Sequence, residues 1–153
     1  MTSERGFLNS FRFKWINWYP PLLGAGIRVL QREGDAYTIK VKMPLTRFNF
    51  NAVGTHFGGS LYAMCDPWLM LILMHHLGRD YIVWDKAAAI QFVKPGKGTV
   101  YATFHIAPET IAAIKARADA GEKLEPVFNV DVIDGAGDVI ARVEKRLYVR
   151  KQK

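Results

Sequence analysis

The chain has a single cysteine, Cys65, among its 153 residues. One thiol cannot form a disulfide within the chain, and it cannot supply the paired cysteines of a structural zinc site. A protein without disulfides fits a reducing compartment, so the composition favours a cytoplasmic location. The first residues also lack the apolar stretch of a secretion signal, and they place an acid beside a base at Glu4 and Arg5.

No apolar run is long enough to cross a membrane. The longest, from Leu61 to Leu73, is shorter than the about 20 residues that a spanning helix needs. Asp66 and Pro67 also interrupt it. The sequence therefore predicts a buried helix and no membrane span. Because burying an unpaired carboxylate costs much free energy, Asp66 is expected to be paired, protonated or used in chemistry.

Acidic residues are the scarcer charged class, with 14 Asp and Glu against 21 Lys and Arg and a net charge of +7. Such a basic surface attracts nucleic acid, anionic lipid or a small polyanion. Part of the excess lies near the C-terminus, at Arg142, Lys145, Arg146, Arg150, Lys151 and Lys153. Two interpretations stay open for these residues: a solvated strand edge and tail, or attraction of a phosphate-bearing ligand. No aromatic and basic module stands out, so nucleic acid is not an expected partner.

Hydrophobic spacing predicts an α+β protein in one domain, residues 1–153, with a helical extension at 1–20. Helices are expected at 7–19, about 57–77 and 108–120, and strands at 27–32, 36–43, 81–94, 99–106, 126–134 and 138–150. Short turns between the strands favour an antiparallel sheet. The helix at about 57–77 is apolar almost all round and is expected to pack against one face of that sheet. The aromatic spacing within 7–19 indicates packing, with contact to lipid or an acyl chain as an open alternative.

A motif precedes and enters the long apolar run. It reads N-x-x-G-T-x-F-G-G-x6-D, and its fixed positions are Asn51, Gly54, Thr55, Phe57, Gly58, Gly59 and Asp66. Over roughly residues 25–150 the chain resembles the hotdog-fold acyl-CoA thioesterases, in the branch that includes phenylacetyl-CoA and hydroxyphenylacetyl-CoA thioesterases. It is more similar still to thioesterase-like proteins with phenylalanine before the two glycines. The resemblance implies a hotdog fold, in which an antiparallel sheet wraps around a long central helix.

The resemblance also implies a site and a reaction. Asp66 would act as general base or nucleophile and face the glycine amides of the other protomer, in a homodimer or a dimer of dimers. The unpaired N–H groups of Gly58 and Gly59 can polarise a thioester carbonyl, and Asn51 would hold that carbonyl or the attacking water. The implied function is hydrolysis of acyl-CoA or another acyl thioester, without a metal or cofactor. Further residues expected to face the substrate are Thr55, His56, Phe57, Tyr62 and Asp85.

One departure from the family keeps a second function open. Many members have histidine where this chain has Phe57, which cannot donate a hydrogen bond or carry a proton. His56 is not expected to replace it, because a shift of one residue at a helix start turns a side chain by about 100°. The alternative function is therefore a non-catalytic hotdog protein that binds acyl-CoA or an acyl carrier.

Each site residue also has a structural interpretation. Asp66 followed by Pro67 suits the cap and first residue of a helix, in which case the long helix is broken at 66 and Asp66 only caps its second half. Asn51 in an asparagine-rich loop is often a turn former, and the two glycines could serve only close packing. His75 and His76 are adjacent with no nearby acidic ligand, so no metal site is expected. Cys65 has no histidine spaced to activate it, and we expect a small buried hydrophobe.

Overall fold

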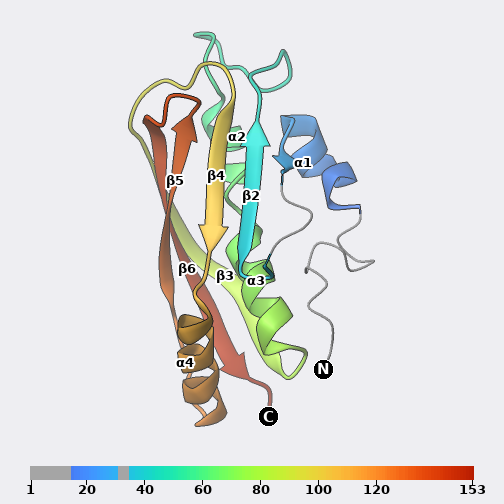
Figure 1. Ribbon diagram of the computed structural model, residues 1–153, viewed down its shortest axis with the longest axis vertical. Coiled ribbons are helices and arrows are strands. Elements are labelled where there is room, and N and C mark those ends of the chain that lie inside the picture. The colour runs from blue at the N-terminus through green and yellow to red at the C-terminus, as the bar shows by residue number, and fades with distance from the viewer. Residues whose placement is uncertain (1–14, 31–34) are drawn as a thin grey trace.

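The structure, a computed structural model, describes residues 15–30 and 35–153. It contains a six-stranded antiparallel sheet with the strand order β1-β2-β4-β5-β6-β3. The strands are β1 Arg28–Val29, β2 Thr38–Met43, β3 Tyr81–Phe92, β4 Val100–His105, β5 Val127–Asp134 and β6 Val139–Lys151. The helices are α1 Pro20–Ala25, α2 Gly58–Ala63, α3 Trp68–Leu77 and α4 Pro108–Asp119, with a 3-10 turn at Ile16–Trp18. Figure 1 shows the sheet curled along α2 and α3, which confirms the predicted α+β architecture around a central helix.

Alternating side chains form the strands and give the sheet its two faces. In β2, Ile39, Val41 and Met43 are buried while Lys40 is exposed, as the period of two requires. The hairpin between β5 and β6 turns at Asp134, whose Oδ1 accepts hydrogen bonds from backbone N–H groups of the turn at 2.9 and 3.0 Å. The strands expected from residue 36 onwards are all present, with ends within two residues of the prediction.

The central helix is divided rather than continuous. The sequence predicts one helix at about 57–77, but α2 ends at Ala63 and α3 begins at Trp68. Pro67 explains the break, because proline lacks an N–H and its ring clashes with the carbonyl one turn earlier. The indole N–H of Trp68 donates to the carbonyl of Met64 at 2.7 Å and satisfies one group that the break frees. In the described part of the chain, no helix is long and apolar enough to cross a bilayer.

The helix predicted at 7–19 can be compared with the structure only from residue 15, because residues 1–14 lie outside the described part. The expected helix at 7–19 ends in a single 3-10 turn, and Tyr19 is extended, as a residue before proline should be. Pro20 does more than end a helix: it starts α1, because its fixed φ suits the first helical position. Trp15 and Trp18 are mostly exposed, so these two rings do not pack into the core.

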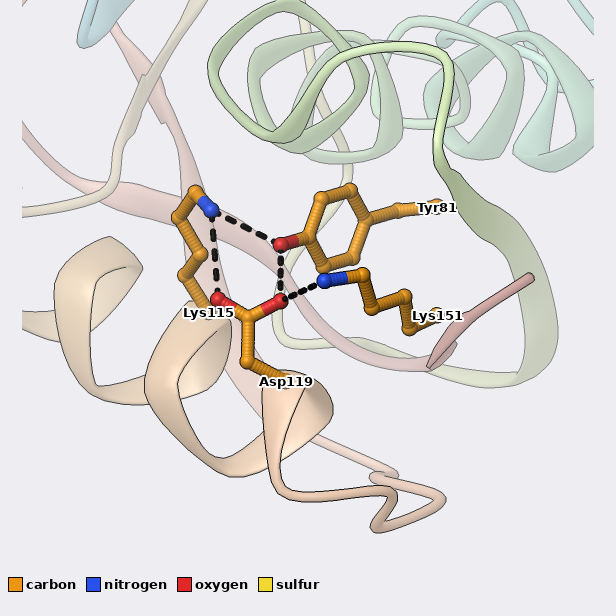
Figure 2. A network of polar contacts seen from close by, with 4 residues as sticks. All are labelled: Tyr81, Lys115, Asp119 and Lys151. Atoms are coloured by element: carbon orange, nitrogen blue, oxygen red, sulfur yellow. Dashed lines mark hydrogen bonds and ion pairs between the residues drawn. The ribbon is translucent and has the colours of Figure 1, made fainter. Parts of the chain in front are cut away.

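A polar network ties the end of α4 to the sheet (Figure 2). The carboxylate of Asp119 accepts hydrogen bonds from the Tyr81 hydroxyl, from Lys151 at 2.8 Å and from Lys115 at 3.3 Å. Lys115 also donates to the Tyr81 hydroxyl at 2.8 Å. The hydrogen bonds from Lys151 and Tyr81 hold the pKa of Asp119 well below its usual range. Asp119 therefore joins α4 to the start of β3 and the end of β6.

We expect Asp119→Asn to lower the thermal midpoint at pH 7 by a few degrees at most, since the group is exposed to solvent. The pKa of Asp119 is lowered in the folded state, so its stabilisation is present above the unfolded value of 3.8 and is lost as the pH falls towards the folded one. The difference between variant and unmodified protein should therefore shrink in acid. Thermal unfolding at pH 7 and near pH 2 checks this, with Asp131→Asn as an exposed control. Equal midpoints at pH 7 would contradict the prediction.

Candidate active site

Asp66 lies in the turn that separates α2 from α3. Its side chain is 49% exposed, and Oδ1 accepts hydrogen bonds from the Tyr62 hydroxyl at 3.0 Å and from Lys145 at 3.1 Å. The described residues give no hydrogen bond to Oδ2. Asp66 does not cap α3, because the cap is Pro67 and no side-chain hydrogen bond closes that helix start. The capping interpretation is wrong, and the carboxylate has one oxygen held and one oxygen available.

Lys145 is the site residue that the sequence analysis missed. Its grouping with solvated C-terminal bases is wrong, because its side chain is fully buried. It stands in the inward row of β6 between Val143 and Leu147. Its ammonium lies 3.1 Å from Oδ1 of Asp66 and 3.0 Å from Oδ1 of Asp85. Lys145 thus joins an acid of the helix break to an acid of β3.

Burial and the charges of this cluster shift the pKa values of several of its groups. Burial lowers the pKa of Lys145, but hydrogen bonds with Asp85, Tyr62 and Asp66 more than offset this, and the net shift is upward. Burial raises the pKa of Asp85, which Lys145 partly opposes. Burial also raises the pKa of the Cys65 thiol to about 12. Lys145 is therefore an ammonium at neutral pH, and Cys65 remains a thiol, which makes it a poor nucleophile.

The two glycines open α2, as the motif predicts, and aromatic rings lie against them. A Cβ on Gly58 would come within 2.8 Å of the Phe92 ring, and one on Gly59 within 2.5 Å of the Phe57 ring. Both rings are more than half exposed. Among the described residues, the N–H groups of Gly58 and Gly59 have no backbone partner. The helix start therefore offers two donors beside movable aromatic side chains.

The loop before α2 uses its polar side chains internally. Asn51 accepts hydrogen bonds from the N–H groups of Val53 and Thr55 and donates to the Thr55 hydroxyl at 2.9 Å. His56 is buried, and its Nε2 lies 2.8 Å from the carbonyl of Gly98. Burial lowers the pKa of His56, so the ring is neutral at pH 7. The geometry accounts for Asn51 as a turn former and engages His56 with the Gly98 carbonyl.

A pocket of about 450 Å³ opens beside this helix start. Its walls come from the loop before α2, from α2 itself and from the end of β3 with the turn that follows. The lining residues are Asn51, Thr55, His56, Gly58, Leu61, Phe92, Val93, Lys94, Pro95 and Gly96. A mostly apolar wall with a few polar groups is typical of a small-molecule site. Asp66 and its partners do not line this pocket.

The structure therefore places the predicted residues, together with Lys145, in two groups. The helix-start group is Asn51, Thr55, His56, Phe57, Gly58 and Gly59, and the aspartate cluster is Tyr62, Asp66, Asp85 and Lys145. Within one chain Asp66 follows Gly58 by eight residues, or about 12 Å along a helix. A reacting carbonyl has to lie about 3 Å from both its attacking group and its oxyanion donors. A continuous helix would hold the two groups too far apart for one carbonyl, and the break between Ala63 and Trp68 places Asp66 in a separate turn.

Neither group has the composition of a metal centre. Within residues 15–30 and 35–153, no three His, Cys, Asp or Glu side chains gather as ligands. His76 instead directs Nε2 to the carbonyl of Ala36 at 3.0 Å and stacks on Tyr37. The chemistry that the described side chains can supply is thus a carboxylate base or nucleophile, amide donors and a fixed ammonium.

Comparison with known proteins identifies the fold and the family. The model of a domain of unknown function, DUF4442, matches residues 9–149. No curated protein matches the chain. The protein of unknown function PA5026 from Pseudomonas aeruginosa superposes with a TM-score of 0.74 at 20% identity, over 95% of this chain and 91% of that one.

Two further solved structures are similar to this chain along most of its length. The E. coli PaaI protein from the phenylacetic acid degradation operon has a TM-score of 0.68 at 15% identity, over 99% of this chain and 97% of that one. Thioesterase HI1161 from Haemophilus influenzae has a TM-score of 0.65 at 14% identity, over 89% of this chain and 86% of that one. Likeness at this identity establishes the fold. The chain belongs to the DUF4442 family and has the hotdog fold of the thioesterases.

Proposed function

We propose that this protein hydrolyses acyl-CoA thioesters at a site shared by two copies of the chain. The observation that carries the proposal is the half-exposed carboxylate of Asp66 at the helix break, with Oδ1 held by Tyr62 and Lys145 and Oδ2 available. The available oxygen can take a proton from water or attack a carbonyl while the other oxygen stays held. The thioesterases of the same fold add weight to a hydrolase among the possible activities of this architecture.

The chemistry follows from the two groups. The amides of Gly58 and Gly59 in one copy bind the thioester oxygen and stabilise its negative charge as the carbonyl becomes tetrahedral. Asp66 of the other copy takes a proton from water as the new C–O bond forms. The C–S bond then breaks, and the thiolate leaves with that proton. If Asp66 instead attacks the carbonyl carbon, C–S cleavage gives a mixed anhydride and a thiolate that takes a proton from solvent, and water then cleaves the anhydride to release the acid and restore the carboxylate. No step requires a metal or a cofactor.

The free edge of β3 supports a homodimer. β3 is the last strand of the sheet and 12 residues long. A long edge strand with unpaired backbone groups is a ready partner for another strand, and proteins rarely leave one uncovered. Ala87, Ala88 and Ala89 are exposed along it and would let a second copy approach closely. Pairing of two β3 strands would bring each aspartate cluster towards the other copy, in a dimer or a dimer of dimers in the cytoplasm.

Hydrolysis of a panel of acyl-CoA thioesters tests the proposal directly. We expect turnover by the unmodified protein and a loss of about 10²- to 10⁴-fold in kcat for Asp66→Ala, the contribution typical of a general base. Asp131→Ala is the matched control, because its carboxylate is exposed and lies 3.6 Å from Arg142 in an ordinary surface ion pair. Equal rates for the two variants would rule out Asp66 as the reacting group.

The second candidate function is acyl-CoA or acyl-carrier binding without catalysis. Phe57 favours it, because an exposed ring at the helix start can pack on an acyl chain but cannot move a proton. The same panel separates the candidates. Binding without turnover, by both the unmodified protein and Asp66→Ala, would support the binding protein.

A further inference from the structure

Lys145 is placed where the fold gains little from a charge. It is fully buried in the inward row of β6, and its neighbours in that row, Val143 and Leu147, are apolar. A buried ion pair is often no more stabilising than an apolar side chain of similar size. A methionine or leucine would continue the row and pack against the helix. The ammonium therefore needs a reason other than stability of the core.

The surroundings of Lys145 show what the charge acts on. Tyr62 from α2 contributes its hydroxyl at 3.2 Å, Asp66 from the helix break its Oδ1 at 3.1 Å, and Asp85 from β3 its Oδ1 at 3.0 Å. Cys65 is the other titratable group nearby, and it stays a thiol because burial raises its pKa to about 12. Two hydrogen bonds, to Tyr62 and Asp66, and one ion pair with Asp85 thus hold the ammonium.

We propose that Lys145 is the positioning residue of the active site, which fixes the Asp66 carboxylate through Oδ1 so that Oδ2 is presented to the substrate. This inference rests on the proposed thioester hydrolysis. β6 and β3 are paired along most of their length, which makes the sheet a rigid support for the ammonium. The N–H groups of Cys65 and Asp66 donate to carbonyls three residues earlier, at 2.8 and 3.3 Å, which fixes the backbone of the turn. The carboxylate itself is held from two elements, by Lys145 of β6 and by the Tyr62 hydroxyl of α2.

Asp85 acts on the same ammonium. Its Oδ1 lies 3.0 Å from the Lys145 ammonium and Oδ1 of Asp66 lies 3.1 Å from it, so one charge is held between β3 and the helix break. Burial raises the pKa of Asp85, and Lys145 partly opposes that rise. Loss of the lysine would leave both Oδ1 atoms without their cationic partner. A lysine that only filled space would hold neither carboxylate.

Kinetics of Lys145→Met and Lys145→Arg test the positioning role. For Lys145→Met we expect kcat for acyl-CoA hydrolysis to fall about 100-fold, as for other small misplacements of a reacting group. KM should change little, because Lys145 does not line the pocket beside the helix start. Lys145→Arg keeps the charge and should recover part of kcat. Lys115→Met, which removes a lysine from the surface network of Asp119, is the control and should leave kcat and KM unchanged.

A measurement without substrate separates this inference from the proposed function. In carboxyl ¹³C NMR at pH 7, the chemical shift of Asp66 should move in Lys145→Met and return towards that of the unmodified protein in Lys145→Arg. This pattern in a protein without turnover would uphold the role of Lys145 and reject the thioesterase. Turnover with the same Asp66 signal in all three proteins would reject the role of Lys145 alone. If Lys145→Met does not fold, Lys145→Gln replaces it, and an unmoved Asp66 signal in that variant overturns the inference.

Discussion

Two inactive variants, Asp66→Ala and Gly58→Asp, should restore activity to each other when they are combined in one dimer. The shared site requires Asp66 from one copy and the helix-start amides from the other. In the mixed dimer one site carries both defects, and the other site carries neither. Purification through two different affinity tags isolates this dimer, and we expect about half of the activity of the unmodified protein per dimer.

The choice of Gly58→Asp follows from the physics of a helix start. A carboxylate in the first turn is favourable for the helix, because the dipole and the unpaired N–H groups attract negative charge. The same carboxylate would occupy the place of the thioester oxygen and repel the charge that develops there. The nearest atoms to a Cβ at residue 58 belong to the ring of Phe92, which is 55% exposed and has room to turn away. The variant should therefore fold and lack turnover.

A control mixed dimer shows whether recovered activity requires one substitution in each of the two groups, the helix-start group and the aspartate cluster. Asp66→Ala and Lys145→Met both lie in the aspartate cluster, so every site of their mixed dimer keeps a defective cluster. This pair should show no recovery beyond the residual rate of Lys145→Met. If the pair of Asp66→Ala with Gly58→Asp also fails to recover, although both variants are folded and dimeric, then the site does not span two copies.

The sequence predicts the sheet and the helix start well because both depend on local patterns. Alternation defines β2, and the two glycines mark the first turn of α2, where the structure has them. The division of the central helix was also visible in Pro67, which removes a backbone donor wherever it stands. The long apolar run outweighed that signal, because hydrophobic spacing continues across the break.

For Lys145 the sequence pattern indicates burial but not the acidic residues that pair with it. Its position was readable, since residues 141, 143, 147 and 149 of the same strand are apolar and point inward. A lysine in that row had to be buried, and a buried ammonium needs acidic partners. Which acids these are depends on the pairing of β3 with β6 and on the helix that packs over them. That information is distributed over residues up to 79 positions apart, beyond the reach of any local pattern.

Trp68→Ala should cause the largest loss of stability among the substitutions considered, about 3–5 kcal/mol in the free energy of unfolding. The indole is fully buried at the start of α3 and packs against Phe104 at 6.3 Å between ring centroids. A loss of this size is a large fraction of the stability of a typical domain. Urea unfolding measures it, and Trp18→Ala, at a ring that is 66% exposed, should change stability much less.

Trp68→Phe separates the hydrogen bond of the indole from its packing. It keeps most of the ring but leaves the carbonyl of Met64 without the donor that lies 2.7 Å away, at an expected cost of about 1–3 kcal/mol. That carbonyl begins the turn that carries Asp66, so a looser turn should also lower kcat more than it raises KM. A variant as stable as the unmodified protein would mean that water replaces the indole. Unchanged kcat in a destabilised variant would mean that Lys145 alone is sufficient to hold the carboxylate in place.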